Sequence, residues 1–327
     1  MVRSQPVALF GGCCTVLLLG AALALQPDPA ALADLYRQAL VKREQQLGPD
    51  HPRVARMASD LGLFLHKQGD NAGAEPYLRR ALAIDEKALG PDDPLVGEDL
   101  ENLAAVLDPR EAIPLYIRAA QHKDSAIAAR NLARLAAYAE RGGNREAALH
   151  LYKQALEREV AASGKDHPRV AILLNDVALL LEPSGAEPLL RRALQIQEKD
   201  PGPQHPETAT TLNNLSSMLF ASGKLAEAEP LQRRALTIFE STLGPNHPRV
   251  AAASSNLADI LRAMEKYTEA RRYYERALAI DEQAYGFDHP EVATDTENLA
   301  ALLEQMGEGK AAQQLRERAA KIRAGAP

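Results

Sequence analysis

The sequence has few of the residues on which cross-linked or metal-bound folds depend. Its 327 residues include two cysteines, the adjacent Cys13 and Cys14. A zinc site of the CxxC type, a disulfide framework and a cysteine nucleophile are therefore excluded from the body of the chain. Tryptophan is absent, and aromatic residues make up only 4%. Because alanine and other small residues take their place, the composition favours closely packed helices over a β-sandwich.

Basic residues are not in excess either. The chain has 38 lysine and arginine residues against 44 aspartate and glutamate residues, which gives a formal net charge of −6. Proteins that bind nucleic acids carry an excess of positive charge, so we expect no nucleic acid partner. Hydrophobic residues make up 46% of the chain, which is enough for a folded core.

A long uncharged stretch, Val7 to Leu25, follows the single charge of Arg3. It ends in Ala22-Leu23-Ala24, which fits the small-x-small pattern of a signal-peptide cleavage site. We therefore expect residues 1–25 to be a signal peptide or membrane anchor and residues 26–327 to form the folded domain. Cleavage would place the protein outside the cytoplasmic membrane, in the periplasm or cell envelope.

Two alternatives for this stretch remain open. As a helix it would reach about 28 Å, close to the thickness of a bilayer core, so an uncleaved membrane anchor is geometrically reasonable. It could instead be a buried helix of the first repeat of a cytoplasmic protein. We expect contact with a membrane only through residues 1–25, and only if they are retained.

A short phrase built around a proline recurs along the rest of the chain. The six copies are LGPDHPRVA (47–55), LGPDDPLVG (89–97), GKDHPRVA (164–171), GPQHPETA (202–209), LGPNHPRVA (243–251) and YGFDHPEVA (285–293). The residues that precede the proline are 42, 74, 38, 42 and 42 positions apart. The interval of 74 contains one further unit that lacks the phrase. Such a period is typical of a repeat array.

Each copy of the phrase predicts the end of one helix and the start of the next. Glycine can adopt the left-handed backbone conformation that ends a helix, and proline is tolerated at the first helical position. We expect the capping oxygens to come from Asp50, Asp92, Asp166, Asn246 and Asp288. The histidines before the prolines are expected to be loop-capping residues, because successive loops lie too far apart to share one zinc ion. His66, His122 and His150 are expected to be solvated.

Counting these boundaries predicts a half repeat, Ala30–Gln46, followed by seven helix pairs. The pairs should start near Pro52, Pro94, Ser125, Pro168, Pro206, Pro248 and Pro290. The second and fourth pairs are shorter than the others between their two helices, so their first helices should be about one turn shorter. We expect a local change of curvature across residues 94–199.

The residue pattern of the two helices resembles the tetratricopeptide repeat. The first helix carries Leu with Gly or Ala, as in Asp60-Leu61-Gly62, and the second carries Ala, an aromatic residue and Ala, as in Ala270–Leu278. The 42-residue period and the LGPDHPxVA loop are similar to the long repeats of kinesin light chains and many bacterial proteins. The resemblance implies an all-α, right-handed solenoid whose first helices line a concave groove that binds proteins.

One polar column accompanies the first helices. Each member precedes the buried apolar residue of its helix: Asn102, Asn214, Asn256 and Asn298, with Asp60 and Asp176 in equivalent places. Arg134 occupies this position in the third pair. The resemblance implies that such asparagines bond the backbone of an extended peptide in the groove, since an amide both donates and accepts. The alternative is that they link neighbouring repeats. A basic clamp for a terminal carboxylate is not evident.

No motif for catalysis is present: the chain lacks GxxxxGK[ST], GxGxxG, HExxH and GxSxG. We therefore expect no enzyme, no catalytic residue, no metal and no cofactor. Paired arginines recur on the second helices, at 79–80, 191–192, 233–234 and 271–272. They are interpreted as a solvated face, with a stripe for an anionic partner as the alternative.

The sequence thus predicts a non-catalytic scaffold or adaptor that binds a peptide or partner helix in its concave groove. One alternative is an intracellular adaptor like kinesin light chain, although the chain shows no long heptad coiled coil. Another is a purely structural spacer. The N-terminal half repeat exposes an unpaired end, which makes self-association a further hypothesis.

Overall fold

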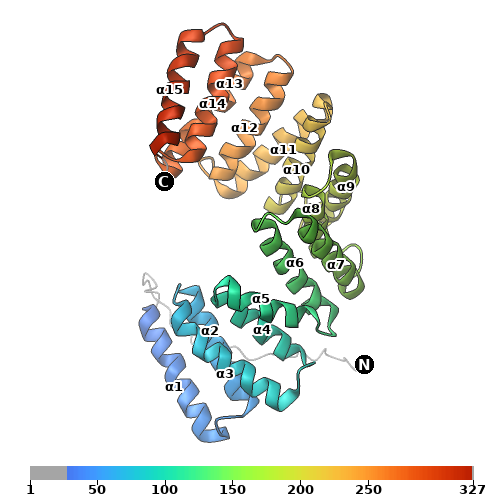
Figure 1. The fold of residues 1–327 in the computed structure, drawn as a ribbon, viewed down its shortest axis with the longest axis vertical. Helices are drawn as coiled ribbons and strands as arrows, with labels where there is room; N and C mark the ends of the chain where they lie inside the picture. Colours follow the sequence, from blue (N-terminus) through green and yellow to red (C-terminus); the bar gives the residue numbers. More distant parts are fainter. Residues whose placement is uncertain (1–27, 326–327) are drawn as a thin grey trace, which may run out of the picture.

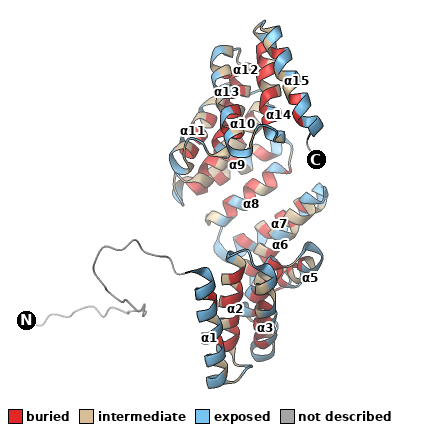
Figure 2. Ribbon diagram, turned by 90° about the vertical axis from the view of Figure 1, so that its left-hand side faces the viewer, coloured by how far each residue is buried: buried red, intermediate tan, exposed pale blue. Residues whose placement is uncertain are grey.

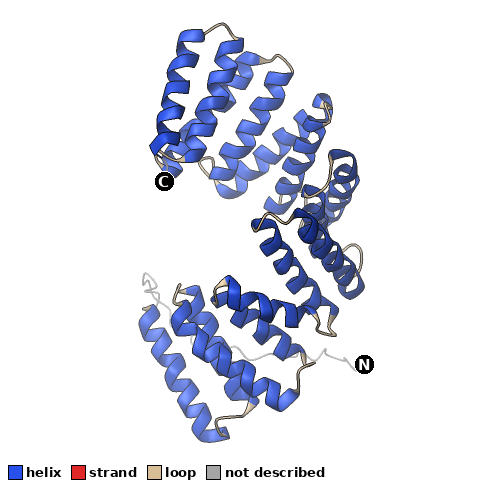
Figure 3. Ribbon diagram, in the orientation of Figure 1, coloured by secondary structure: helices blue, strands red, loops and turns tan. Residues whose placement is uncertain are grey.

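The computed structural model describes residues 28–325, which form fifteen helices and no strands in that range (Figure 1, Figure 3). The helices are α1 (Pro29–Leu47), α2 (Pro52–Lys67), α3 (Asn71–Leu89), α4 (Pro94–Val106), α5 (Pro109–Ala120), α6 (Ser125–Arg141), α7 (Arg145–Ser163), α8 (Pro168–Leu179), α9 (Pro183–Lys199), α10 (Pro206–Ala221), α11 (Leu225–Leu243), α12 (Pro248–Ala263), α13 (Tyr267–Tyr285), α14 (Pro290–Gln305) and α15 (Gly309–Gly325). The predicted signal segment lies outside the described residues.

The helices pair in chain order. Helix α1 stands alone as the half repeat, and α2–α3 through α14–α15 form seven hairpins in which each helix packs on its neighbours along the chain. The all-α repeat array and the predicted start of every pair are confirmed. Figure 1 shows the array bending into an open arc, with α1–α5 and α12–α15 at its ends and α6–α9 between them.

The shortened repeats are present as predicted. Helix α4 has 13 residues and α8 has 12, whereas α2, α10, α12 and α14 each have 16. At the open end of the array, α1 buries only Ala33 and Leu40 (Figure 2). Its Leu35 and Val41 are 59% and 51% exposed.

Small residues mark the closest approach within each hairpin. They occupy one position on each first helix and one on its partner: Gly62 and Ala74, Ala104 and Ala112, Ala136 and Ala148, Ala178 and Ala186, Ser216 and Ala228, Ala258 and Ala270, and Ala300 and Ala312, all buried. A Cβ atom on Gly62 would lie 2.6 Å from Cγ of Leu78. Ser216 donates its hydroxyl to the carbonyl oxygen of Ala228 at 2.9 Å. A larger side chain at these positions would force the two helices apart.

Histidine, and not the preceding acidic residue, caps the first helices. Nδ1 of His51 accepts from the backbone N–H of Arg53, two residues later, at 3.1 Å. The equivalent bond, at 3.1–3.3 Å, is made by His167, His205, His247 and His289. Asp93 performs this role for α4 with its carboxylate. The histidine prediction is therefore confirmed.

The prediction that the residue before the cap supplies the oxygen is wrong. Asp50, Asp92, Asp166, Asn246 and Asp288 lie one position too early to cap these helices. Asp50 instead pairs with Lys87 of α3, at 2.6 Å, and Asp92 and Asp166 pair with Lys123 and Arg192. These three loop acids thus tie their loops to a basic residue later in the chain.

The loop glycines have a backbone that other residues rarely adopt. Gly48, Gly90, Gly164, Gly244 and Gly286 have φ between 86° and 92° and ψ between 154° and 165°. The positive φ agrees with the prediction, but the extended ψ differs from that of a left-handed helical turn. Each of these helices therefore opens directly into an extended loop that leads to the next cap, which is Asp93 after Gly90 and a histidine after the other four.

His122 contradicts the expectation that it is solvated, because it is only 6% exposed. Its Nδ1 accepts from the backbone N–H of Asp124 at 3.0 Å, and its Nε2 lies 3.2 Å from the carbonyl oxygen of Asp93. Helix α5 ends at Ala120, so the short link to α6 folds the imidazole inward against Gly97. The shortened second repeat therefore brings this histidine into the interface.

An ion-pair ladder runs along the second helices and contains two of the eight paired arginines, Arg80 and Arg234. Each rung joins a glutamate to an arginine of the next second helix: Glu44–Arg80, Glu86–Arg118, Glu198–Arg234, Glu240–Arg276 and Glu282–Arg318. The ladder stops at α7, where Gln154 and Val160 occupy the equivalent positions. Individual half-exposed pairs contribute only about 0–1 kcal/mol each. These arginines are therefore engaged within the array.

Two pairs of buried aspartates lie at the same position of two inter-repeat interfaces. Asp85 of α3 meets Asp99 of α4, and Asp281 of α13 meets Asp295 of α14. Burial, and then the charge of the partner, raises the pKa of Asp99 and of Asp295 to about 7. The equivalent positions between α11 and α12 carry the buried residues Phe239 and Ala253. The fold therefore does not require ionisable groups there.

These pairs predict how stability depends on pH. Their folded pKa lies above the value of about 3.9 of an unfolded aspartate, so the folded chain binds more protons between the two values. Stability should therefore fall as the pH rises from about 4 to about 7. We expect D295N to raise the midpoint of thermal unfolding by about 2–5 °C at pH 8 and by less at pH 5. Circular dichroism at both pH values, with the exposed-loop variant D288N as control, measures this. An equal effect of D295N at both values would contradict it.

Candidate functional site

The first helices form the concave layer of the array. Helix α2 contacts α4, α4 contacts α6, α8 contacts α10, and α10 contacts α12, more extensively than any two second helices contact each other. In a curved array the layer with the closer spacing lies on the inside. Side chains that project from the free faces of the first helices therefore line the concave surface.

Three clefts of similar size lie between successive first helices. The α2–α4 cleft has a volume of about 210 Å³, the α6–α8 cleft about 220 Å³ and the α8–α10 cleft about 240 Å³. Members of the predicted polar column line each of them. Asp60 and Asn102 lie in the first, Arg134 and Asp176 in the second, and Asp176 and Asn214 in the third. The second and third clefts also share Ile172, so they lie on either side of the same face of α8.

Two of the predicted asparagines link neighbouring repeats. Nδ2 of Asn214 donates to Oδ1 of Asn175 at 3.3 Å, and Nδ2 of Asn256 donates to Oδ1 of Asn213 at 3.0 Å. Both bonds join one first helix to the preceding one. At these positions the amide is at least partly engaged inside the array.

The other members of the column are less engaged. Asp60 faces Arg56 of its own helix at 3.4 Å, and within residues 28–325 Asn102, Asn298 and Asp176 make no side-chain hydrogen bond. All six predicted residues are half-buried. The column therefore divides into linking members and members whose polar atoms remain available to a ligand.

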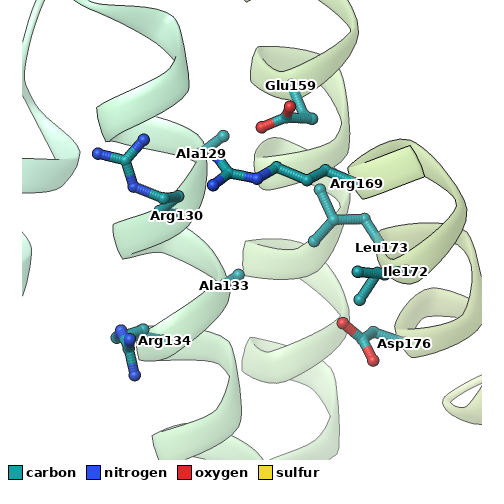
Figure 4. A pocket seen from close by; sticks show the side chains of 9 residues that line it. All are labelled: Ala129, Arg130, Ala133, Arg134, Glu159, Arg169, Ile172, Leu173 and Asp176. Atoms are coloured by element: carbon teal, nitrogen blue, oxygen red, sulfur yellow. The ribbon is translucent and has the colours of Figure 1, made fainter. Parts of the chain in front are cut away.

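The α6–α8 cleft combines an apolar floor with a charged rim (Figure 4). Ala129, Ala133, Ile172 and Leu173 form the floor, and Arg130, Arg134, Arg169 and Asp176 surround it. Glu159 also lines the cleft but is only 1% exposed. The sequence analysis singled out Arg134 but missed Arg169 and Ile172. Their signal is an arginine and an isoleucine on the free face of a first helix, the isoleucine being 40% exposed.

Charges in the α6–α8 cleft differ in how they are balanced. Arg130 bonds both carboxylate oxygens of Glu101 at 3.0 and 3.1 Å, whereas the Arg134 guanidinium lies 5.9 Å from the ring centroid of Tyr116. Burial, and then the charge of Glu140, raises the pKa of Asp176 to about 6. The cleft can therefore hold an apolar side chain with polar groups around it.

The α2–α4 cleft is acidic. Asp60, Asp85, Glu98 and Asp99 line it together with Arg56. Asp85 and Asp99, which lie 14 positions apart on either side of a loop, were not among the predicted residues. Their signal is an aspartate in the apolar stripe of each of two helices that pack together.

Within the part of the chain that the structure describes, no helix is long and apolar enough to cross a membrane. In the same range, no three or more His, Cys, Asp or Glu side chains are placed to hold a metal ion. Each loop histidine instead accepts a hydrogen bond from the backbone of its own first helix.

Comparisons with known families agree with this architecture. One family model, described as tetratricopeptide repeat, matches residues 13–87, 53–125, 185–241, 207–283 and 249–324, and a second of the same description matches residues 129–169. No curated protein matches the chain.

Several solved structures also match the chain. A putative kinesin light chain from Podosopora anserina with nearly identical repeats is 25% identical, with a TM-score of 0.53, over 60% of this chain and 94% of that one. A Rap protein complexed with competence and sporulation factor is 14% identical, with a TM-score of 0.58, over 84% of this chain and 77% of that one. BtubC from P. vanneervenii is 21% identical over 93% of this chain and 92% of that one, with a TM-score of 0.36.

The two classes of column asparagine predict different effects on stability. Asn256→Ala removes a hydrogen bond between two first helices and should cost about 0.5–1.5 kcal/mol. Asn298→Ala removes none among residues 28–325 and should change stability by less than about 0.5 kcal/mol. Thermal unfolding of both variants compares them directly. Equal losses would show that the Asn256 bond does not contribute to stability.

Proposed function

The chain belongs to the tetratricopeptide repeat family, and we propose that it is a non-catalytic scaffold that binds a peptide or helix of a partner protein on its concave face. The observation that supports this most directly is the series of three clefts of about 210–240 Å³ along the first helices. Each cleft has the size of one or two side chains. Their repetition along one surface suits a ligand that is itself extended.

The chemistry of the clefts also suits a peptide. Exposed apolar residues such as Ile172 and Leu179 provide surface that a ligand side chain can bury. Asn102 and Asn298 offer amides that can donate to and accept from a peptide backbone.

Ile172 offers the sharpest test, because it lines both the α6–α8 and the α8–α10 clefts. We expect I172E to weaken partner binding at least about tenfold, since a buried unpaired charge would replace an apolar contact. The matched control is V160E on α7. Val160 is 37% exposed and Ile172 is 40% exposed, so the two side chains are equally accessible. Val160 lies on a second helix, away from the concave face.

The measurement begins with capture of partners from a cell-envelope extract by the full chain. A purified partner is then titrated against wild type, I172E and V160E, after circular dichroism has shown that all three fold. Equal binding by I172E and wild type would move the site away from the α6–α8 and α8–α10 clefts. Failure to capture any partner would favour the spacer hypothesis.

We also propose that residues 1–25 direct export, which their uncharged stretch and Ala22-Leu23-Ala24 support. The expected result is a mature chain in the cell envelope that begins after Ala24. Intact-mass analysis of the protein from its native host measures this. A retained N-terminus in the cytoplasm would instead support the intracellular adaptor.

A further inference from the structure

A buried amide fixes the orientation of Asn214 in the polar column. Asn175 of α8 is 7% exposed, and its Nδ2 donates to the carbonyl oxygen of Ala171 at 3.1 Å. Because a carbonyl oxygen only accepts hydrogen bonds, the amide of Asn175 must turn its nitrogen towards Ala171 and its Oδ1 away from it. Oδ1 of Asn175 can in turn only accept. The atom of Asn214 that faces it at 3.3 Å is therefore Nδ2.

The same constraint acts on Asn256, one repeat further along. Gln232 of α11 is fully buried, and its Nε2 donates to the carbonyl oxygen of Ala253 at 3.0 Å and to Asn213 at 2.8 Å. The atom of Asn213 that accepts this bond is therefore Oδ1, and the same Oδ1 faces Asn256 at 3.0 Å. Asn256 must consequently present its Nδ2 to Asn213. Backbone carbonyl groups thus decide which way both column asparagines point.

This orientation leaves the amide oxygens of the two asparagines free. Among the described residues, Oδ1 of Asn214 and Oδ1 of Asn256 make no hydrogen bond, and neither atom is buried. The carboxylate of Asp176, at the equivalent position of α8, is accessible from two clefts and has no hydrogen bond either. Three consecutive first helices, α8, α10 and α12, therefore present oxygen acceptors at the same place (Figure 1). We call Asp176, Asn214 and Asn256 the acceptor row.

The rest of the column does not continue this row. Asn102 and Asn298 make no side-chain hydrogen bond within residues 28–325, so either end of their amides can face a ligand. Asp60 pairs with Arg56 of its own helix, and Arg134 has only donors. The acceptor row is therefore confined to α8, α10 and α12.

We propose that the acceptor row binds backbone N–H groups of an extended segment of the partner peptide, and that Asn175, Asn213 and Gln232 are its positioning residues. This inference rests on the proposed function and specifies the form in which the ligand is bound. Beyond its first turn, a helix has no free backbone N–H groups, so only an extended segment can offer them in a row. Arg169 and Arg249 line the same clefts and would repel a lysine or arginine side chain.

The spacing of the acceptor row suits an extended chain. N–H groups on one edge of such a chain recur at every second residue, about 7 Å apart. Packed helices lie about 8–10 Å apart, and side-chain tips on the concave side of an arc are closer together than the helix axes. Carbonyl groups alternate with the N–H groups along that edge of the chain. The guanidinium of Arg249, which lines the α8–α10 cleft, can donate to one of them.

The first experiment selects peptides from a random ten-residue library displayed on phage, with the full chain as target. In synthetic copies of a selected peptide, each backbone amide is replaced in turn by an ester, which removes one N–H group and keeps the side chain. We expect binding to weaken about three- to tenfold at two or three positions that alternate along the peptide, and little elsewhere. Equal effects at all positions, or no effect at any, would overturn the inference.

A double-mutant cycle then assigns one N–H group of the peptide to Asn214. N214A removes the acceptor, so it should weaken binding of the all-amide peptide. At one ester-sensitive position the ester should cause no further loss in N214A, because the bond is already absent. If every ester effect is as large in N214A as in wild type, Asn214 does not bind a peptide N–H group and the acceptor row is wrong.

The positioning role is tested at Asn175. N175L keeps the volume of the side chain but removes the acceptor that holds Nδ2 of Asn214 inward, so the amide of Asn214 can turn. The ester effect at the position assigned to Asn214 should then fall to about twofold or less, whereas a merely structural role would lower stability alone. The matched control T296V removes a buried side-chain bond of α14, outside the row, and should keep the full effect.

Circular dichroism shows whether these variants fold. If N175L does not, Q232M makes the same test at Asn256, because it removes the donor that orients Asn213. A folded N175L or Q232M with an undiminished ester effect would overturn the positioning role.

The same peptides distinguish this inference from the proposed function. Peptides that lose affinity for I172E but have no ester-sensitive position coupled to Asn214 would leave the concave site in place and overturn the acceptor row. Peptides that bind I172E as well as wild type would place the site away from both clefts of α8 and overturn the row with it. Selection of no peptide would overturn both.

Discussion

The close approach of the two helices in every hairpin is the constraint on which the rest of the structure depends. Buried alanine, glycine or serine occupies both sides of that contact in all seven hairpins. Side chains of this size leave little freedom in the angle between the helices, so each hairpin repeats nearly the same shape. The glycine loop and the histidine cap then place the next hairpin. Curvature and the concave layer follow from this repetition.

Because buried apolar clusters hold successive repeats together, the free faces of the first helices can vary. The equivalent position carries Asp60, Arg134, Asp176 or Asn214 in different repeats without a change of fold. The three clefts consequently have similar volumes and different charges. A repeat array can therefore present several distinct sites along one surface, and its selectivity depends on their order.

Most of the fold could be predicted from the sequence because its signals are local and periodic. Glycine, histidine and proline mark each boundary, and a shortened interval translates directly into a shorter helix. Errors arose where the exact position of a side chain mattered. The cap lies directly before Pro52, so His51 reaches the free N–H groups and Asp50 does not. His122 is buried because α5 ends early, which a pattern of single residues does not show.

The candidate site was less accessible to sequence reasoning. The resemblance placed the polar column on the first helices, but which of its members face a ligand depends on bonds between repeats, such as Asn256 to Asn213. Asp85 and Asp99 were missed because each alone resembles a surface residue. Phe239 and Ala253 show that this position accepts a neutral apolar pair. A buried aspartate pair therefore lowers stability at neutral pH, and the fold does not require one at this position.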